Sequence, residues 1–271
     1  MAIKLAVVIV HGIGTDTAPD FAEGLIAALK DRIGATGKSA SEAAFAPVYW
    51  ADITKGAQQR YLEAARGAAE LDFMSVRRFV VGALGDAAAY QRVDDPADSV
   101  QGEIHQRVRE AIHELYMTRL KETAVPLVVM AHSLGGHILS NYIWDLQHRN
   151  VGLKGLSGFE RYWTHAGMIT FGCNIPLFTF AHKKVVPISF PGPRLDKSTA
   201  KLARWYNYFD SDDVLGYPLK PLSAAYAKVV DADIEVNVGG LLSSWNPLSH
   251  TQYWTDGSFT KPVGEFVAGF L

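Results

Sequence analysis

Short runs of apolar residues recur along the chain where buried strands are expected. Residues 5–10 (LAVVIV) and 126–131 (PLVVMA) are uninterrupted apolar runs. This pattern is typical of strands that are covered on both faces of a sheet. Weaker runs predict further strands at 44–50, 166–171, 203–209 and 227–236.

Amphipathic segments with helical spacing lie between these runs. Residues 20–33 and 135–147 carry apolar side chains three or four positions apart, and residues 53–123 predict two or three helices, the last over 100–121. Strands that alternate with helices predict a mostly parallel sheet with helices on both faces, because each crossover returns the chain to the starting edge. The sequence therefore predicts the α/β class, with a helical insertion at 53–98 before the strand at 126–131.

Within this insertion, residues 70–90 are unusually apolar and include Phe73, Met74 and Phe79 beside two arginines. Three interpretations are open: a core helix, a lid over a pocket, or a surface that contacts lipid. We favour the core helix, because an apolar helical stripe usually packs inward.

Composition narrows the class of protein. The chain has 271 residues, with 26 Lys+Arg against 28 Asp+Glu for a net charge of −2, and 48% of its residues are hydrophobic. These values argue against a disordered chain and against a nucleic-acid partner, which needs a basic surface. Cys173 is the single cysteine and cannot form an internal disulfide, so a cytoplasmic protein is expected. The run at 5–10 is too short for a membrane span, and the sequence indicates no oligomeric state.

The strongest local pattern is Ala131-His-Ser133-Leu134-Gly135-Gly136, between an apolar run and an amphipathic segment. Small residues two positions either side of a serine permit a tight strand-to-helix turn, which would push the serine oxygen into the open at a helix N-terminus. Ser133 is therefore a candidate nucleophile. The alternative is an ordinary serine N-cap.

A second pattern, His11-Gly12-Ile13-Gly14, ends the first strand. An acyl-transfer enzyme needs two backbone N–H groups aimed at the oxygen that becomes negative, and glycines leave such groups uncovered. Taken alone, the pattern is equally compatible with a turn that only ends the strand.

Together these motifs resemble the α/β-hydrolase superfamily, in particular bacterial lipases and esterases. The resemblance implies that the N–H groups of Ile13 and Leu134 form an oxyanion hole, with Gly12 as a further candidate. It also implies the chain order serine, acid, histidine.

A histidine downstream of the serine is therefore required as the base. Of the five histidines after Ser133, only His250 lies beyond the last predicted strand. Its setting, S-H-x-x-Y-W, resembles the histidine loop of the family, and His250 is the predicted base. His137, four residues after Ser133, is expected to be a surface or packing residue.

The acid is expected in the segment that follows the predicted strand at 203–209, where Asp210, Asp212 and Asp213 lie close together. In similar lipases an Asp is followed by Val or Ile and then by Pro, which favours Asp213 as the triad acid. Asp210 is the alternative, and Asp212 is expected to face water. Asp and Ser also favour turns, so two of the three carboxylates have a local role in this interpretation.

Two further patterns are given structural roles. Cys173 lacks a histidine partner and is expected to be inert. Asp86 and Tyr90 form a D-x-x-x-Y pattern that braces helices in some similar bacterial proteins, and no chemistry is assigned to them.

We therefore expect one α/β-hydrolase domain over 1–271 that acts as a serine hydrolase on carboxylic esters through an acyl-enzyme. No cofactor or metal is expected. The predicted substrate is a small-molecule or lipid ester, with peripheral lipid contact as an alternative role for 70–90. Other hypotheses are a catalytically silent hydrolase-like protein that binds a partner or a lipid surface, and an acyltransferase or thioesterase with the same triad. Aromatic and apolar residues could line an acyl pocket: Phe73, Met74, Phe79, Trp245, Tyr253 and Trp254.

Overall fold

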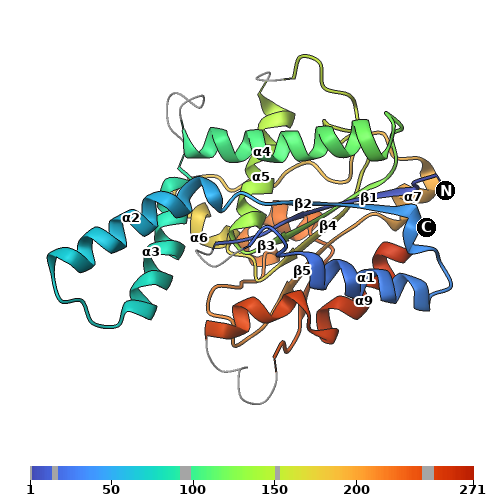
Figure 1. The fold of residues 1–271 in the computed structure, drawn as a ribbon. Helices are drawn as coiled ribbons and strands as arrows, with labels where there is room; N and C mark the ends of the chain where they lie inside the picture. The colour runs from blue at the N-terminus through green and yellow to red at the C-terminus, as the bar shows by residue number, and fades with distance from the viewer. Residues whose placement is uncertain (1, 14–17, 92–98, 150–152, 240–246) are drawn as a thin grey trace.

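A six-stranded parallel sheet with the strand order β2-β1-β3-β4-β5-β6 forms the centre of the molecule (Figure 1). The computed structural model describes residues 2–13, 18–91, 99–149, 153–239 and 247–271. The strands are β1 Leu5–Val10, β2 Ala43–Val48, β3 Leu127–His132, β4 His165–Phe171, β5 Arg204–Phe209 and β6 Ala232–Glu235. The prediction of a parallel α/β sheet is confirmed.

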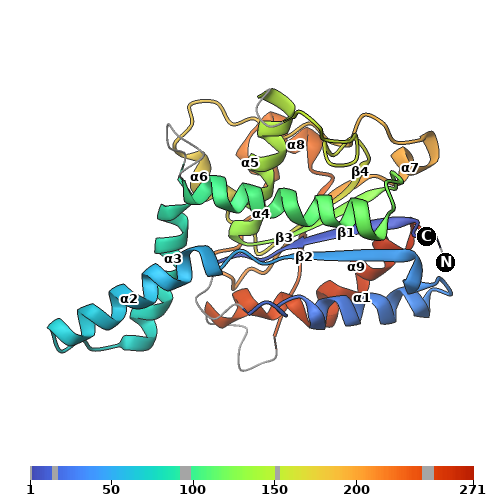
Figure 2. The ribbon, with the colours of Figure 1, turned by 45° about the horizontal axis from the view of Figure 1, so that its top comes forward.

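Helices cover both faces of this sheet, as the sequence predicts. Helices α1 (Glu23–Ala35) and α9 (Gly257–Ala268) pack together on one face, while α4 (Val100–Glu114) and α5 (Leu134–His148) lie on the other (Figure 2). The N-terminal and C-terminal parts of the chain therefore share one layer.

The continuous apolar sequence of β1 follows from its place between these layers. Leu5, Val7 and Ile9 join the core cluster under α1 and α9, whereas the alternate residues Ala6 and Val8 join the cluster under α4 and α5. Side chains on a strand point alternately to the two faces, so a strand covered on both sides has no solvent-facing position.

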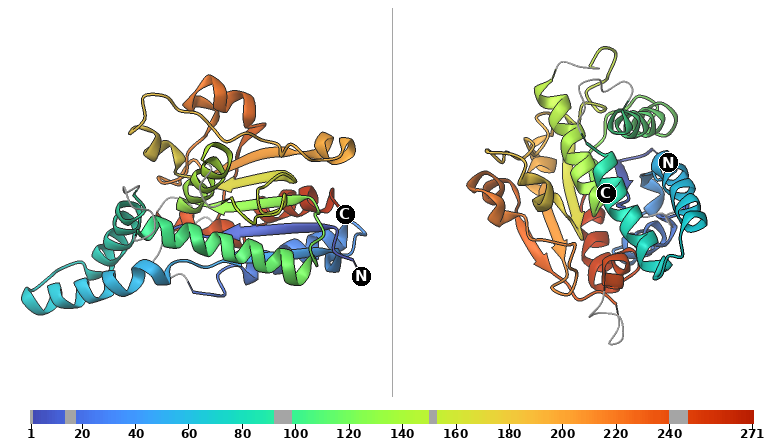
Figure 3. Two further views of the ribbon diagram at one scale, coloured as in Figure 1. Left: turned by 90° about the horizontal axis from the view of Figure 1, so that it is seen from above. Right: turned by 90° about the vertical axis from the view of Figure 1, so that its left-hand side faces the viewer.

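The helical insertion between β2 and β3 is also confirmed. Helices α2 (Asp52–Ala68) and α3 (Met74–Ala89) form a hairpin, here called the arm, that extends away from the sheet (Figure 3). The Asp86 carboxylate accepts hydrogen bonds from Thr54 Oγ1 at 2.7 Å and from Gln58 Nε2 at 2.6 Å. Asp86 therefore joins α3 to α2. Beyond the hairpin, the Tyr90 hydroxyl bonds to His105 Nε2 on α4 at 2.7 Å. The D-x-x-x-Y pattern thus braces helices, as expected.

The interpretation of 70–90 as a core helix is wrong. Phe73, Val76, Val80 and Leu84 are 78%, 57%, 42% and 66% exposed. Because the arm extends away from the sheet, α3 meets protein mainly on its side toward α2, and its apolar stripe has no core to enter. The side chain of Phe79 lies outside the described residues.

Several boundaries differ from the sequence prediction. The strand predicted at 227–236 is in fact helix α8 (Ala224–Val229) followed by β6, because the Ser223 hydroxyl caps the helix by accepting from the Tyr226 N–H. The helix predicted over 100–121 ends as α4 at Glu114 and continues as a π-helical turn, η3 (Leu115–Arg119). Elements without a sequence prediction are α6 (Ile175–Thr179), α7 (Lys197–Leu202), α9, and the 3-10 turns η1 (Ala40–Glu42), η4 (Lys220–Leu222) and η5 (Pro247–Trp254).

The described ranges contain neither a candidate membrane span nor a candidate metal site. No helix in them has the length and apolarity needed to cross a membrane. In the same residues, no three His, Cys, Asp or Glu side chains are grouped so that they could hold a metal ion.

Candidate active site

Ser133 lies on the tight turn that joins β3 to α5. Its backbone has a φ of 52° and a ψ of −125°, a conformation that is strained for a residue with a side chain. The hydroxyl does not cap the helix, so the ordinary N-cap interpretation is wrong. Such strain at a strand-to-helix turn is typical of a nucleophile elbow.

The glycines around this turn are required because the end of β1 and the turn approach each other closely. A Cβ on Gly135 would lie 2.5 Å from the His11 carbonyl oxygen and 2.7 Å from that of Val10. A Cβ on Gly12 would lie 2.4 Å from the Ser133 Cβ. The glycines thus let the end of β1 pass directly beside Ser133.

We expect Gly135→Ala to lower the free energy of unfolding by about 3 kcal/mol, because the new methyl group would overlap carbonyl groups of β1 that cannot move aside. Urea denaturation followed by circular dichroism would measure the change. Gly34→Ala on α1 is the matched control, since a Cβ there meets nothing within 4 Å. That control should stabilise the protein by about 0.5–1 kcal/mol, and a comparable gain for Gly135→Ala would contradict the packing argument.

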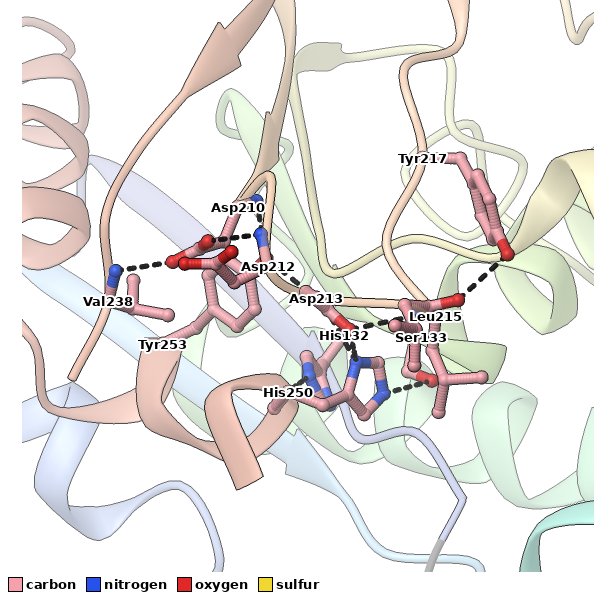
Figure 4. Close-up of polar contacts among 11 residues, drawn as sticks. His132, Ser133, Asp210, Asp212, Asp213, Leu215, Tyr217, Val238, His250 and Tyr253 are labelled. Carbon is pink, nitrogen blue, oxygen red and sulfur yellow. Dashed lines mark hydrogen bonds and ion pairs between the residues drawn. The ribbon is translucent and has the colours of Figure 1, made fainter. Parts of the chain in front are cut away.

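The structure brings Ser133, His250 and Asp213 together from three separate parts of the chain (Figure 4). His250 Nε2 lies 2.8 Å from Ser133 Oγ, and His250 Nδ1 lies 2.9 Å from both Asp213 carboxylate oxygens. An ionised carboxylate can only accept, so Nδ1 carries a proton and a neutral ring leaves Nε2 to accept from the serine hydroxyl. This arrangement places a nitrogen that can accept a proton beside the Ser133 hydroxyl, and an anionic carboxylate beside the other nitrogen of the same ring.

The two alternative aspartates lie elsewhere. Asp210 is buried and accepts hydrogen bonds from the N–H groups of Val238 at 2.6 Å and Asp212 at 2.8 Å, with no bond to His250. Asp212 is exposed. The geometry therefore favours Asp213 as the partner of His250 and gives Asp210 the task of holding the loop.

Electrostatics keep the Asp213 carboxyl ionised. Burial by itself raises its pKa, but hydrogen bonds from His250, from the Leu215 N–H and from the Tyr253 hydroxyl outweigh burial and leave the pKa below the ordinary value. Tyr253 Oη donates to Asp213 Oδ2 at 3.0 Å and accepts from the Asp210 N–H at 2.8 Å. Tyr253 therefore connects the two aspartates, a position that sequence reasoning missed although the S-H-x-x-Y-W pattern contains it.

We expect Tyr253→Phe to lower the free energy of unfolding at neutral pH by about 1–3 kcal/mol, since it removes a donor from Asp213 and an acceptor from the Asp210 N–H. The Asp213 part of this effect follows the depressed pKa: it is present above the unfolded carboxyl pKa of about 3.9 and is lost as pH falls through the folded value. Urea denaturation at several pH values across this range would measure the free energy of unfolding of the parent and of Tyr253→Phe. Equal stability at pH 7 would contradict a role for the hydroxyl.

A second histidine, His132, packs beside the His250 ring and bonds to the His250 backbone. Its Nε2 lies 2.7 Å from the His250 carbonyl oxygen, which can only accept, so this nitrogen carries the proton. Burial and the neighbouring His250 ring lower the pKa of His132 well below its ordinary value, which keeps it neutral. His132 thus fixes the backbone of the His250 turn.

His11 has a corresponding role at the other predicted motif. Its Nδ1 donates to the Gly12 carbonyl at 2.7 Å, while its Nε2 accepts from the Trp50 N–H at 3.0 Å. Burial lowers the pKa of His11 to about 4, so the ring stays neutral in this tautomer. The Gly12 carbonyl and the Ile13 N–H belong to one planar peptide. His11 therefore fixes the orientation of that predicted oxyanion donor.

The second predicted donor, the N–H of Leu134, is the first of helix α5. The first four N–H groups of a helix have no acceptor within it, and they lie at the positive end of the helix dipole. Leu134 directly follows Ser133, and Gly12 is in contact with Ser133, so both predicted donor segments flank the hydroxyl. Gly14, the last residue of the His-Gly-Ile-Gly motif, lies outside the described residues.

Burial of the site differs from expectation. Ser133 has no exposed surface, and His250 and Asp213 are 4% and 3% exposed. The prediction that the turn pushes the serine oxygen into the open is wrong for this conformation, since Gly12 packs against Ser133 and His250 bonds to its oxygen.

The residues suggested for an acyl pocket do not form a group. Phe73 and Met74 lie on the arm, and Tyr253 is buried with its hydroxyl against Asp213. Trp254 packs its ring against His132, with the ring centroids 5.3 Å apart. Trp245 lies outside the described residues.

Cys173 is buried beside the elbow helix. Burial raises the pKa of its thiol to about 12, so no thiolate is present near neutral pH. A Cβ on Gly136 would lie 2.7 Å from its sulfur, which shows how tightly the cysteine packs. The prediction that Cys173 is structural agrees with these contacts. His137 is likewise a packing residue, stacked on Phe178 at 4.1 Å between ring centroids.

No protein-family model and no curated protein matches the sequence. The chain is similar to the crystal structure of a proposed hydrolase of the alpha/beta superfamily from Xanthomonas campestris pv. campestris, with 14% sequence identity and a TM-score of 0.35. The match covers 96% of this chain and 98% of that one. At this level of similarity the comparison assigns no activity to this chain.

Proposed function

We propose that the protein is a serine hydrolase that cleaves carboxylic esters, with Ser133 as nucleophile, His250 as base and Asp213 as the acid that orients it. The observation that carries this proposal is the unbroken hydrogen-bonded chain from Ser133 Oγ through His250 to Asp213. Such a chain is the arrangement by which a neutral hydroxyl becomes a nucleophile near neutral pH.

The proposed reaction has two halves. His250 Nε2 takes the proton as Ser133 Oγ attacks the carbonyl carbon, and the N–H groups of Ile13 and Leu134 bind the oxygen that becomes negative. The imidazolium then gives its proton to the leaving alcohol. Water enters, His250 activates it, and the acyl group leaves as a carboxylic acid. Throughout, Asp213 stays ionised and stabilises the imidazolium.

Two observations support an enzyme over a catalytically silent protein. The strained backbone of Ser133 costs about 1–3 kcal/mol, and a serine kept only for packing has no need of that conformation. The second observation is that His11 and His132 hold the flanking peptides in fixed orientations, as preorganised catalysis requires. Thioester hydrolysis and acyl transfer share these residues and differ only in the leaving group or the acceptor.

Labelling with a small fluorophosphonate tests the proposal. Intact protein should incorporate one label per chain, and Ser133→Ala should incorporate none. Ser198→Ala, which alters an exposed serine at the start of α7, should label like the parent. An unlabelled parent, or a labelled Ser133→Ala protein, would remove the basis of the proposal.

A series of p-nitrophenyl esters, with matched thioesters, then separates the finer alternatives. We expect turnover of the oxygen esters to exceed that of the thioesters and to persist without an added acyl acceptor. Turnover that requires an alcohol acceptor, or that occurs only with thioesters, would replace ester hydrolysis by acyl transfer or thioester cleavage.

A further inference from the structure

A cavity of 480 Å³ lies between α5, α6, the end of α3 and the segment 181–186. Its volume falls within the range of small-molecule sites, about 300–1,000 Å³. None of Ser133, His250, Asp213 or the His11–Ile13 segment lines it, and Ser133 has no exposed surface through which the cavity could reach it. The cavity is therefore separate from the site described above.

One face of helix α5 forms the floor of the cavity. The residues that line it are His137, Ser140, Asn141 and Trp144, which follow one another at intervals of three, one and three positions and so share a face. These positions run along about 10 Å of helix, starting one turn beyond Ser133. The cavity is thus long enough for an extended chain or a pair of fused rings.

Apolar and aromatic side chains provide most of its walls. Ile175 and Phe178 come from α6, Val185 and Val186 from the adjoining segment, and Tyr90 from the end of α3. His137 adds to this apolar lining, because burial lowers its pKa to about 3 and its ring stacks on Phe178 while Asn141 donates to its Nε2. A ligand body in contact with these walls would have to be apolar.

Lys184 is the charged residue among the lining positions that the structure describes, and no acidic side chain occurs among them. Amide groups of Gln91, Gln101 and Asn141 add neutral hydrogen-bonding capacity. An ammonium group beside apolar walls whose described positions carry no carboxylate attracts an anion and disfavours a cation.

We propose that this cavity binds a small organic anion with an apolar body, of the class of medium-chain or aromatic carboxylates, with the carboxylate at Lys184 and the body against α5 and α6. The proposal does not depend on ester hydrolysis, because the cavity and the triad share no residue.

Isothermal titration calorimetry with octanoate, 1-octanol and octylammonium tests the proposal, because these probes share one chain and differ in charge. Octanoate should bind the most tightly and octylammonium the least, and added salt should weaken octanoate binding. Lys184→Gln should weaken octanoate binding by about two- to fivefold and leave 1-octanol unchanged. Lys183→Gln is the matched control, since Lys183 does not line the cavity, and it should leave both unchanged.

Filling the cavity with a larger side chain provides a second test of the proposal. Ala87→Trp should reduce octanoate affinity at least about tenfold, whereas Ala88→Trp, at an exposed position of the same helix outside the lining, should not. Ala181→Trp fills the cavity from an exposed position in the segment 181–186 and is used if Ala87→Trp does not fold. Ser133→Ala should bind octanoate like the parent.

Three results would overturn the proposal: octylammonium binding as tightly as octanoate, unchanged octanoate binding after the cavity is filled, or loss of binding in Ser133→Ala. Binding of octanoate by a protein that no fluorophosphonate labels would sustain the cavity proposal while removing the proposed hydrolase activity.

Discussion

Replacing His250 with alanine is expected to lower kcat for a short-chain p-nitrophenyl ester by about 10⁶-fold, because triad members act as a unit. Without the imidazole nothing accepts the proton that Ser133 Oγ must lose, and nothing returns a proton to the leaving alcohol. Steady-state kinetics measures the effect. Residual turnover above the uncatalysed rate would reflect binding and the oxyanion donors alone.

His113→Ala is the matched control for this experiment. His113 lies on α4, where its Nδ1 bonds to Glu160 at 2.8 Å with the side chain 59% exposed. Its loss should leave kcat unchanged. A His250→Ala protein that retains its thermal unfolding transition and more than about one per cent of parental kcat would exclude His250 as the base, since the expected loss is far greater.

The second large effect is expected at the acid, where two neighbouring aspartates should behave differently. Asp213→Asn should lower kcat by about 10⁴-fold, because an amide that donates to His250 Nδ1 would force the proton onto Nε2, the nitrogen that must accept from Ser133. Asp210→Asn should lower kcat less than about tenfold, since among the described residues its oxygens bond to the N–H groups of Val238 and Asp212 and not to His250. Its main expected effect is a loss of about 1–3 kcal/mol of stability.

Kinetics and urea denaturation of both variants separate these roles. Loss of activity only in Asp210→Asn would transfer the acid role to Asp210 and contradict the geometry. Equal large losses in both variants, with unchanged stability, would mean that the two carboxylates act on His250 together through Tyr253.

The parallel sheet was predictable from the sequence because its central strands carry their own signal. A strand covered on both faces has no solvent-facing position, so β1 and residues 127–131 of β3 appear in the sequence as unbroken apolar runs. The elbow was predictable for a similar reason, since a Cβ on Gly135 would meet backbone atoms of β1 and of His11 at distances that no larger residue tolerates.

Features that depend on packing between distant segments were not predictable. The apolar stripe of α3 has the spacing of a core helix, and only the direction of the arm shows that it faces outward. Likewise, Asp210 and Asp213 have similar local sequence surroundings. What separates them is the position of the His250 turn, which lies 37 residues further along the chain. The tasks of His11 and Tyr253 also arise from contacts across long sequence separations.

The separation of 117 residues between Ser133 and His250 has a consequence for synthesis on the ribosome. The six strands of the described sheet and helix α5 precede η5 in the chain, so every strand of that sheet can emerge before His250 does. A nascent chain that stops before residue 247 contains Ser133, Asp213 and this sheet but lacks the proposed base. Under the proposed function, hydrolytic competence would therefore appear only once η5 has been made, later than the elements that hold Ser133.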